Sequence, residues 1–312
     1  MDVLSDVLET VRLRGLLTGA FTMAPPWGFR AEAAPHAVFF TLTRGSGWLE
    51  VDGVTRASRR LEAGDVVVLP RGDGHILRDD PRTRPIEASM FRAGQQALPH
   101  AASGNEARMV GGCFPRLGAP PHPVLESLPP LLHLRKDEGQ TSPWLDPIVH
   151  ILAHEAETRG QGAATVLNRL ADVLFVQVLR THLLYLPEDE RGFLRGLTHP
   201  GVAAAMHAIH TAPERDWPVA ALARKARMSR SAFAAVFVEL VGEPPAQYLT
   251  RWRIARAADL LSDGNTNVKT AAALVGYASE SAFRRVFRKW VGVAPKQFQR
   301  TSTQPRAAAR WL

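Results

Sequence analysis

The chain has 312 residues, of which 46% are hydrophobic and 22% charged, and its formal net charge is +8. These values are typical of a globular protein and argue against a disordered or fibrous chain. No stretch approaches the roughly 20 uncharged apolar residues of a membrane helix. The first ten residues are acidic, unlike a secretory signal, and the single cysteine, Cys113, excludes an internal disulfide. At about 150 residues per domain we expect two domains in a cytoplasmic protein.

The basic charge is concentrated in the last third of the chain. Residues 217–312 contain 16 Lys and Arg against 5 Asp and Glu, a net of +11, whereas residues 1–216 carry a net of −3. Such asymmetry favours a polyanion as the partner of the C-terminal part. A solvated basic surface with no partner is the alternative.

The first 120 residues have the pattern of β structure. Short apolar runs alternate with glycine-containing turns, one of which is Asp52-Gly53, a favoured hairpin turn. Short runs separated by turn signals predict a barrel or a sandwich. The expected strands are 37–42, 48–51, 66–69 and 86–91.

The middle of the chain is predicted to be helical. Proline is dense between residues 115 and 130, which indicates a connecting segment. Residues 145–159 and 163–186 then carry apolar side chains at helical spacing. This apolar stripe packs either on its own domain or on a second subunit. From residue 200 on we expect helices at 202–211, 218–226, 229–241, 245–262, 268–275, 279–290 and 295–300.

A repeat at an offset of 50 residues is the strongest signal. Residues 229–249 align with residues 279–299, and ten of the 21 positions are identical. One structural unit therefore occurs twice. Each copy fits a helix–turn–helix in which Ser229 or Ser279 caps the second helix. Phe233, Phe237 and their counterparts Phe283 and Phe287 fall on one face and are predicted to be core.

The opposite face of each second helix could contact DNA, because arginine binds guanine edges or phosphates. The second copy is rich in arginine, while the first is small and nearly uncharged, so we expect unequal contributions. A solvated helix face is the alternative. The candidate DNA contacts are Ser229, Arg230, Ser231, Ala234 and Ala235 in the first copy and Ser279, Glu280, Ser281, Arg284, Arg285 and Arg288 in the second.

A helix over residues 245–261 joins the two copies. It would span about 25 Å, less than the ~34 Å between successive major-groove faces of B-DNA, so an offset or a DNA bend must supply the difference. Arg251, Arg253 and Arg256 on this helix are candidate phosphate contacts. Alternatively, they only neutralise nearby acidic groups.

Residues 200–300 resemble the AraC/XylS-type DNA-binding domain. The residues that carry the resemblance are Val275-Gly276-Tyr277, Ser281-Ala282-Phe283, Val286-Phe287, Gly292 to Pro295 and Phe298. The resemblance implies two helix–turn–helix units with the second helix of each in the major groove. Family members commonly have larger polar residues where this chain has Ala234 and Ala235, which puts strong base readout by the first unit in doubt.

Residues 64–75 have the spacing G-x5-P-x-G-x2-H and resemble the second motif of the cupin barrel. In metal-binding cupins that histidine is a ligand, and a first motif supplies two more histidines and a glutamate. Here the corresponding stretch has only His36, so we predict no metal and no cofactor. The candidate ligand-binding residues are His36, Trp48 and His75 at a barrel that, by this resemblance, covers residues 2–185.

Cys113 lies among small and apolar residues and is a redox-sensor candidate, although such a cysteine is more often inert. No Ser, His and Asp arrangement at an interpretable spacing indicates nucleophilic catalysis, so the chain is predicted not to be an enzyme.

Together these patterns predict an α+β protein. We expect a cupin-like β-barrel sensor domain (1–125), a helical linker or dimerisation segment (126–195), an all-α DNA-binding domain (196–303) and a tail (304–312). The two helix–turn–helix units are placed at 218–242 and 268–292.

The leading hypothesis is a bacterial transcription regulator that binds promoter DNA in the nucleoid under the control of a small molecule or a redox signal. A homodimer is compatible with it, as are activation through RNA polymerase and repression. One alternative is a metal-dependent cupin dioxygenase or isomerase with an appended DNA-binding domain. The other is a nucleoid protein without sequence preference.

Overall fold

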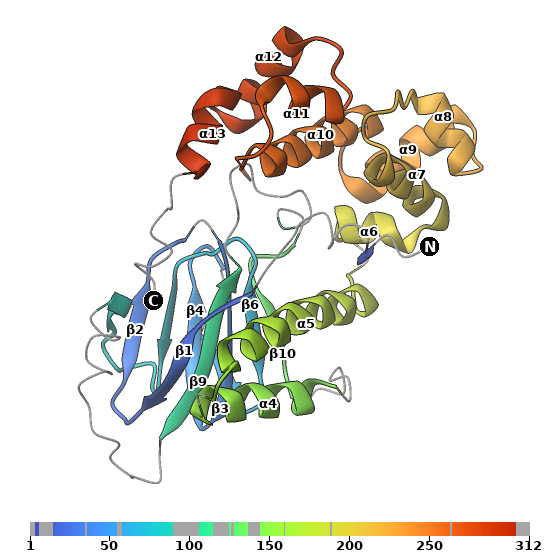
Figure 1. The fold of residues 1–312 in the computed structure, drawn as a ribbon. Coiled ribbons are helices and arrows are strands. Elements are labelled where there is room, and N and C mark those ends of the chain that lie inside the picture. Colours follow the sequence, from blue (N-terminus) through green and yellow to red (C-terminus); the bar gives the residue numbers. More distant parts are fainter. Residues whose placement is uncertain are drawn as a thin grey trace. The chain divides into compact units, whose positions relative to one another are not determined.

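A computed structural model of the chain describes residues 4–5, 15–34, 36–54, 58–89, 106–114, 125, 128–136, 144–158, 160–187, 189–262 and 264–303. The chain divides into two compact units, one formed mainly by residues 14–115 with 129–184 and the other mainly by residues from 185 on. The first contains all the described strands, and the second is helical (Figure 1). The candidate tail, 304–312, lies outside the described residues.

The first unit is built on two five-stranded sheets. Neighbouring strands pair antiparallel except β2 and β8, which are parallel. One sheet has the order β1 (Leu16–Met23), β9 (Ala107–Phe114), β3 (Ala37–Arg44), β6 (Val66–Leu69), β10 (Leu132–Leu134). The other has the order β5 (Arg59–Glu62), β4 (Ser46–Val51), β7 (His75–Arg78), β2 (Gly28–Ala31), β8 (Ile86–Glu87).

Strand β3 shows how the core is organised, because successive side chains of a strand point to opposite faces. Phe40 belongs to a buried cluster with Leu49 and Leu77 of the other sheet. Phe39 instead packs on Phe114, with ring centroids 5.2 Å apart, and Phe114 packs on a phenylalanine of a covering helix. The strand is therefore buried on both faces, which explains its nearly continuous run of apolar residues.

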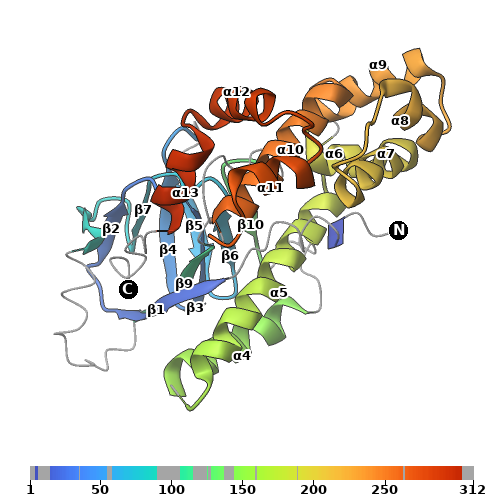
Figure 2. The same ribbon diagram turned by 45° about the horizontal axis from the view of Figure 1, so that its top comes forward.

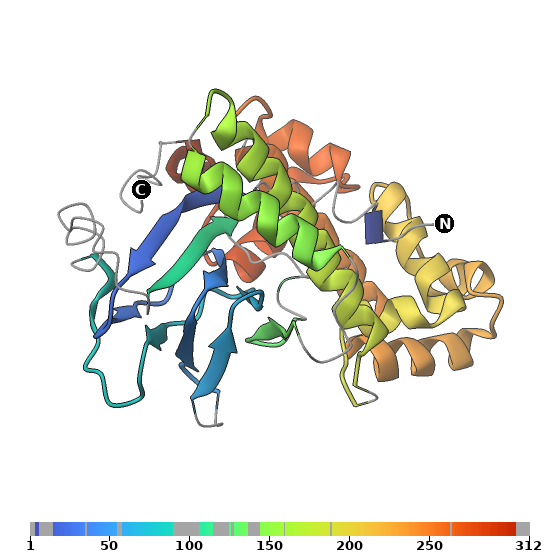
Figure 3. The same ribbon diagram turned by 90° about the horizontal axis from the view of Figure 1, so that it is seen from below.

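Two helices cover the first sheet, α4 (Leu145–Thr158) and α5 (Ala163–Leu184), as Figure 3 shows. Phe175 of α5 lies with its ring centroid 4.7 Å from that of Phe114. Asn168 accepts a hydrogen bond from the backbone N–H of Leu17 at 3.1 Å, so α5 also satisfies part of the free edge of β1. Part of the apolar stripe, including Leu152, Leu167 and Leu174, is buried on its own domain, whereas Ile151, Val166 and Val173 are at least 40% exposed.

The domain boundaries differ from those expected. The structure places β10, α4 and α5 in the same compact unit as the other strands, rather than in a separate linker over 126–195. The physical reason is that β3, β6 and β9 have two apolar faces, and the outer one is buried only when the helices cover it. The unit that begins near residue 185 contains the predicted helix–turn–helix segments.

A buried polar network ties β10 to the barrel. Asp65, after the turn that precedes β6, accepts hydrogen bonds from His133 Nε2 and from the backbone N–H of Lys136, both at 3.0 Å, and from that of Glu62 at 3.1 Å. Burial acts to raise the pKa of Asp65, but the three hydrogen bonds outweigh it and the pKa is lowered. No local sequence pattern predicts this network, because His133 lies 68 residues from Asp65.

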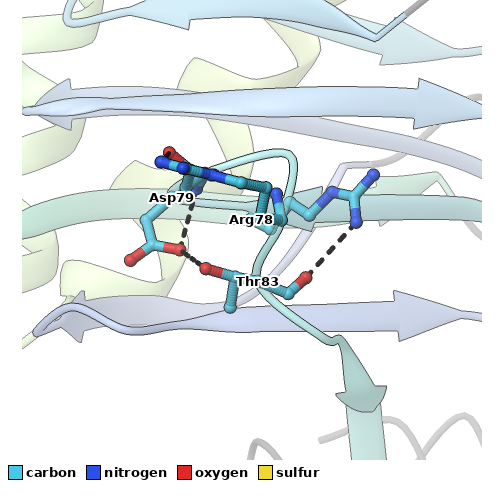
Figure 4. Close-up of polar contacts among 5 residues, drawn as sticks. Arg78, Asp79 and Thr83 are labelled. Atoms are coloured by element: carbon cyan, nitrogen blue, oxygen red, sulfur yellow. Dashed lines mark hydrogen bonds and ion pairs between the residues drawn. The ribbon is translucent and has the colours of Figure 1, made fainter.

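The turn after β7 is held by its own side chains (Figure 4). Asp79 accepts from the Thr83 hydroxyl at 2.6 Å and from the backbone N–H of Asp80 at 2.8 Å. Arg78 donates to the Thr83 carbonyl at 3.3 Å and pairs with Glu50 of β4. This turn leads the chain from β7 to β8 at the edge of the second sheet.

Three of the four predicted strands lie within the observed β3, β4 and β6. Strand β8 covers residues 86 and 87 of the expected strand 86–91, whose residues 90 and 91 lie outside the described residues. The helices were predicted to within about two residues at nearly every end. In the part of the chain that the structure describes, no helix is long and apolar enough to cross a membrane.

Candidate functional site

The helical unit contains the two predicted helix–turn–helix units around one long helix (Figure 2). That helix, α10 (Pro245–Ser262), has 18 residues and a length of about 27 Å. The first unit pairs α8 (Val219–Lys225) with α9 (Arg230–Val241), and the second pairs α11 (Val268–Leu274) with α12 (Glu280–Val291). The other helices of this body are α6 (Phe193–Thr198), α7 (Pro200–Thr211) and α13 (Pro295–Thr303).

Both units have the same aromatic core. Phe233 and Phe237 are fully buried with ring centroids 5.5 Å apart, and Phe237 meets Tyr248 of α10 edge-on at 5.6 Å. In the second unit Phe283 and Phe287 are equally buried at 5.4 Å, and Phe287 meets Phe298 of α13 edge-on at 5.5 Å. The predicted core positions thus hold the second helix of each unit against its neighbours.

The ends of α9 and α12 are also alike. The Ser229 hydroxyl accepts from the backbone N–H of Ala232 at 3.2 Å, and that of Ser279 from Ala282 at 3.4 Å. Each helix ends at a glycine in the left-handed conformation, Gly242 with φ of 85° and Gly292 with φ of 84°. Both serines therefore act as N-terminal helix caps, in addition to being candidate DNA contacts.

The turns between the helices differ by one residue. Arg227 and Gly276 occupy the left-handed position after the first helix, with φ of 57° and 85°. Their offset is 49 residues, whereas the offset of the following helices is 50, so the second unit has one extra residue, Ala278. A side chain on Gly276 would also meet the Glu214 carbonyl oxygen at 2.6 Å, a contact too close to exist. Glycine is therefore needed only in the second turn.

The predicted DNA-facing side chains of α9 lie on the surface. Arg230, Ser231 and Ala235 are exposed, and Ala234 is half-buried. Val238, one turn further along, is 39% exposed. This face carries one cation and is otherwise small or apolar.

The corresponding face of α12 is strongly basic. Ser281, Arg284, Arg285 and Arg288 are exposed, and Glu280 is half-buried. The Glu280 carboxylate accepts from Arg284 at 2.9 Å (Nε) and 2.5 Å (Nη2), an i,i+4 pair at the start of the helix. Arg284 is thus held in one orientation while 55% of its side chain stays exposed.

Two of the three linker-helix arginines have partners inside the protein. Arg251 forms an ion pair with Glu243, and both side chains are less than one-fifth exposed. Arg253 donates to the carbonyl of Pro213 at 2.7 Å and to that of Arg215 at 2.8 Å, and burial lowers its pKa. The contacts of Arg251 match the neutralisation of an acidic group rather than a phosphate contact. Arg253 binds the loop before α8 through these two carbonyl groups.

The barrel unit contains a cavity of about 120 Å³ between its strands. Its wall is mainly apolar and aromatic and includes Phe21, Phe29, Phe40 and Met109. His36 and His75 line it as well, so the structure brings these two predicted residues together. An apolar cavity of about 150 Å³ is large enough to hold benzene, which sets the scale of a ligand that fits here.

His75 is buried, with 5% of its surface exposed, and its ring stacks on Phe40 at 5.8 Å. Its Nδ1 lies 3.1 Å from the Asp73 carbonyl oxygen. Burial lowers the pKa of His75, so the ring is neutral at pH 7. Across the residues that the structure describes, no group of three His, Cys, Asp or Glu side chains could hold a metal ion.

Trp48 does not line the cavity and corrects the prediction that it contacts a ligand. Its neighbour Leu49 points into the core, and Trp48, opposite Arg60 and Arg78 on the adjacent strands, therefore lies on the outer face. Cys113 lines the cavity on β9 and is 6% exposed. Burial raises the pKa of its thiol to about 11, which leaves little reactive thiolate at neutral pH.

Two helix–turn–helix units and a β-barrel with a ligand-sized cavity define the class of transcription regulators that combine sensing and DNA binding in one chain. Residues 2–184 match the family described as Cupin, and residues 222–301 match a helix-turn-helix domain family.

Full-length relatives agree. The chain is 35% identical to a putative AraC-like transcription regulator of Streptomyces lividans over 98% of this chain and all of the relative. A second such regulator, from Streptomyces antibioticus, is 32% identical over 96% and 99% of the two chains. The HTH-type transcriptional regulator AlkR of Acinetobacter baylyi is 28% identical over 97% and 100%. The chain belongs to the AraC-like family of transcription regulators and binds DNA through its helix–turn–helix domain, and these relatives are transcription regulators rather than enzymes.

Proposed function

We propose that this regulator binds a limited set of promoter sites through α9 and α12, under the control of a small molecule held in the barrel. The observation that carries the proposal is that α9 and α12 have the same caps and the same buried phenylalanines. The predicted contact residues of both helices therefore lie on the opposite face, away from the core. The α12 face supplies most of the electrostatic attraction through Arg284, Arg285 and Arg288. The small face of α9 supplies close contact with sugars or thymine methyl groups.

Footprinting on genomic DNA tests this proposal. The purified full-length protein should protect a few sharp sites at moderate salt. The variant Arg285→Ala/Arg288→Ala should lose them, whereas Arg82→Ala, which removes a 90%-exposed arginine from the barrel unit, should not. Diffuse protection across the genome would instead indicate a nucleoid protein without sequence preference.

Control by the barrel is supported by the cavity, because a ligand shifts an equilibrium only when it binds one state of the protein better than another. A molecule that fills the cavity should therefore change the affinity for DNA. A redox signal at Cys113 has weaker support, since the thiol is buried and protonated.

Self-association is a further part of the proposal. Ile151 of α4 and Val166 and Val173 of α5 are each at least 40% exposed although they are apolar. A second copy that covers them would give a dimer with two DNA-binding units. Sedimentation of Val166→Glu/Val173→Glu beside the unchanged protein measures this, and an unchanged mass would exclude that face.

A further inference from the structure

The described wall of the barrel cavity contains one acidic side chain and no Lys or Arg. Among the described residues that line it, Glu32 is the sole Asp, Glu, Lys or Arg, and its side chain is exposed. Arg30, the nearby cation, is paired with Asp52 at 2.8 Å and does not line the cavity. An anionic ligand would therefore leave water without gaining a Lys or Arg partner among the described lining residues, which disfavours its binding.

His75 is a polar lining residue whose hydrogen-bonding role follows from its contact inside the protein. A carbonyl oxygen only accepts hydrogen bonds, so His75 Nδ1 carries the hydrogen in its contact with Asp73. In the neutral ring the other nitrogen, Nε2, is then an acceptor. Thr18, another lining residue, already donates its hydroxyl to the Gly111 carbonyl at 2.9 Å. A ligand that meets His75 must consequently bring the donor.

We infer that the cavity takes a small, uncharged, mainly apolar molecule with one hydrogen-bond donor, such as a simple phenol. The inference rests on the proposed function, which supplies the reason for a ligand, and it adds the chemical class. The wall of Phe29, Phe40 and Met109 contributes apolar contact, the volume limits the ligand to about one ring, and His75 orients the donor. Binding of a carboxylate is disfavoured because the described lining residues include Glu32 and neither Lys nor Arg.

The test uses the full chain and three probes of equal ring size, namely 4-fluorophenol, fluorobenzene and 4-fluorobenzoate, followed by fluorine NMR titration. We expect 4-fluorophenol to bind roughly three- to tenfold more tightly than fluorobenzene, the effect of one net hydrogen bond. The benzoate should not bind. His75→Phe keeps the ring on Phe40 but removes the acceptor, so the phenol and fluorobenzene should then bind equally.

Filling the cavity provides the second arm. A side chain at Gly111 would make only ordinary contacts, 3.4 Å from the Phe39 carbonyl oxygen and Phe40 Cβ, so Gly111→Val is expected to fold and to abolish probe binding. Ala88→Phe replaces it if that variant does not fold. Trp48→Phe, on the outer face of β4, is the control that should leave probe binding unchanged.

The outcomes separate the two proposals. Tighter binding of 4-fluorobenzoate, lost in Gly111→Val, would overturn the uncharged class while leaving small-molecule control intact. Binding of no probe at millimolar concentration, or phenol binding that His75→Phe does not weaken, would overturn the inference. Phenol binding with no change in DNA affinity would confirm the ligand class and contradict control by the barrel.

Discussion

The two helix–turn–helix units are the same inside and different outside. Their caps, buried phenylalanines and terminal glycines correspond, and the φ angles of Gly242 and Gly292 differ by 1°. On the outer faces, Ala234 and Ala235 correspond to Arg284 and Arg285. Packing restricts the inner positions, because each phenylalanine must fill a closed space. The outer positions are not restricted by packing, so their side chains can differ between the two units.

The largest effect should come from the shared core. Phe233→Ala and Phe283→Ala each remove a fully buried ring, and each should lower the free energy of unfolding by about 3–5 kcal/mol. Urea unfolding of the full chain measures this, with the half-exposed Val238→Ala as the control. A change below about 1 kcal/mol in one unit alone would break the equivalence of the two cores.

The outer faces should separate the units in DNA binding. Arg284→Ala and Arg285→Ala should each weaken specific binding by about 1–3 kcal/mol if these side chains contact bases. Gel-shift titration at fixed salt measures the change. Arg82→Ala is the charge-matched control. Unchanged affinity after both substitutions would remove Arg284 and Arg285 from the interface.

The terminal glycines should again behave alike. An added Cβ would meet no atom within 4 Å at Gly292 and only the Arg191 Cβ, at 3.8 Å, at Gly242. Gly242→Ala and Gly292→Ala should therefore each cost only the left-handed backbone strain, about 1–2 kcal/mol. Thermal unfolding of the two variants side by side would show a difference if one helix ended in another conformation.

A charge on the small face tests whether α9 enters the groove. Ala234→Asp should weaken DNA binding by about 1 kcal/mol, because a carboxylate would then approach a phosphate. Ala234→Asn is the matched neutral control and should bind nearly as well as the unchanged protein. Equal affinities of the two variants would mean that the first unit stays off the DNA.

The smallest effect should come from the Glu280–Arg284 pair. Exposed i,i+4 pairs stabilise a helix by about 0.3–0.5 kcal/mol, so Glu280→Gln should barely alter folding. It should raise affinity for unrelated DNA, since a carboxylate is removed from a basic face, and thereby reduce discrimination between sites. Competition with non-specific DNA measures this. Unchanged discrimination would mean that the pair does not set the orientation in which Arg284 binds.

The amino-acid sequence by itself determined the helical domain almost completely. The phenylalanine spacing follows the 3.6-residue period of a helix and predicts its exposed face, and the serine caps mark where the helices begin. The repeat transfers both patterns from one unit to the other. The sequence also indicated the barrel and two of its cavity residues, His36 and His75, through short motifs.

Only the tertiary structure decided on which face of β4 Trp48 lies. Alternate residues of a strand point to opposite faces, but which of the two faces meets the core depends on what the sheet packs against. The tertiary structure likewise decided that Arg251 is paired with Glu243 and Arg253 with distant carbonyls, that α4 and α5 belong to the barrel, and that Asp65 anchors β10. Except for the Arg251–Glu243 pair, which spans eight residues, these contacts join residues far apart in the chain. Their partners are chosen by packing in three dimensions, and no local sequence pattern records that choice.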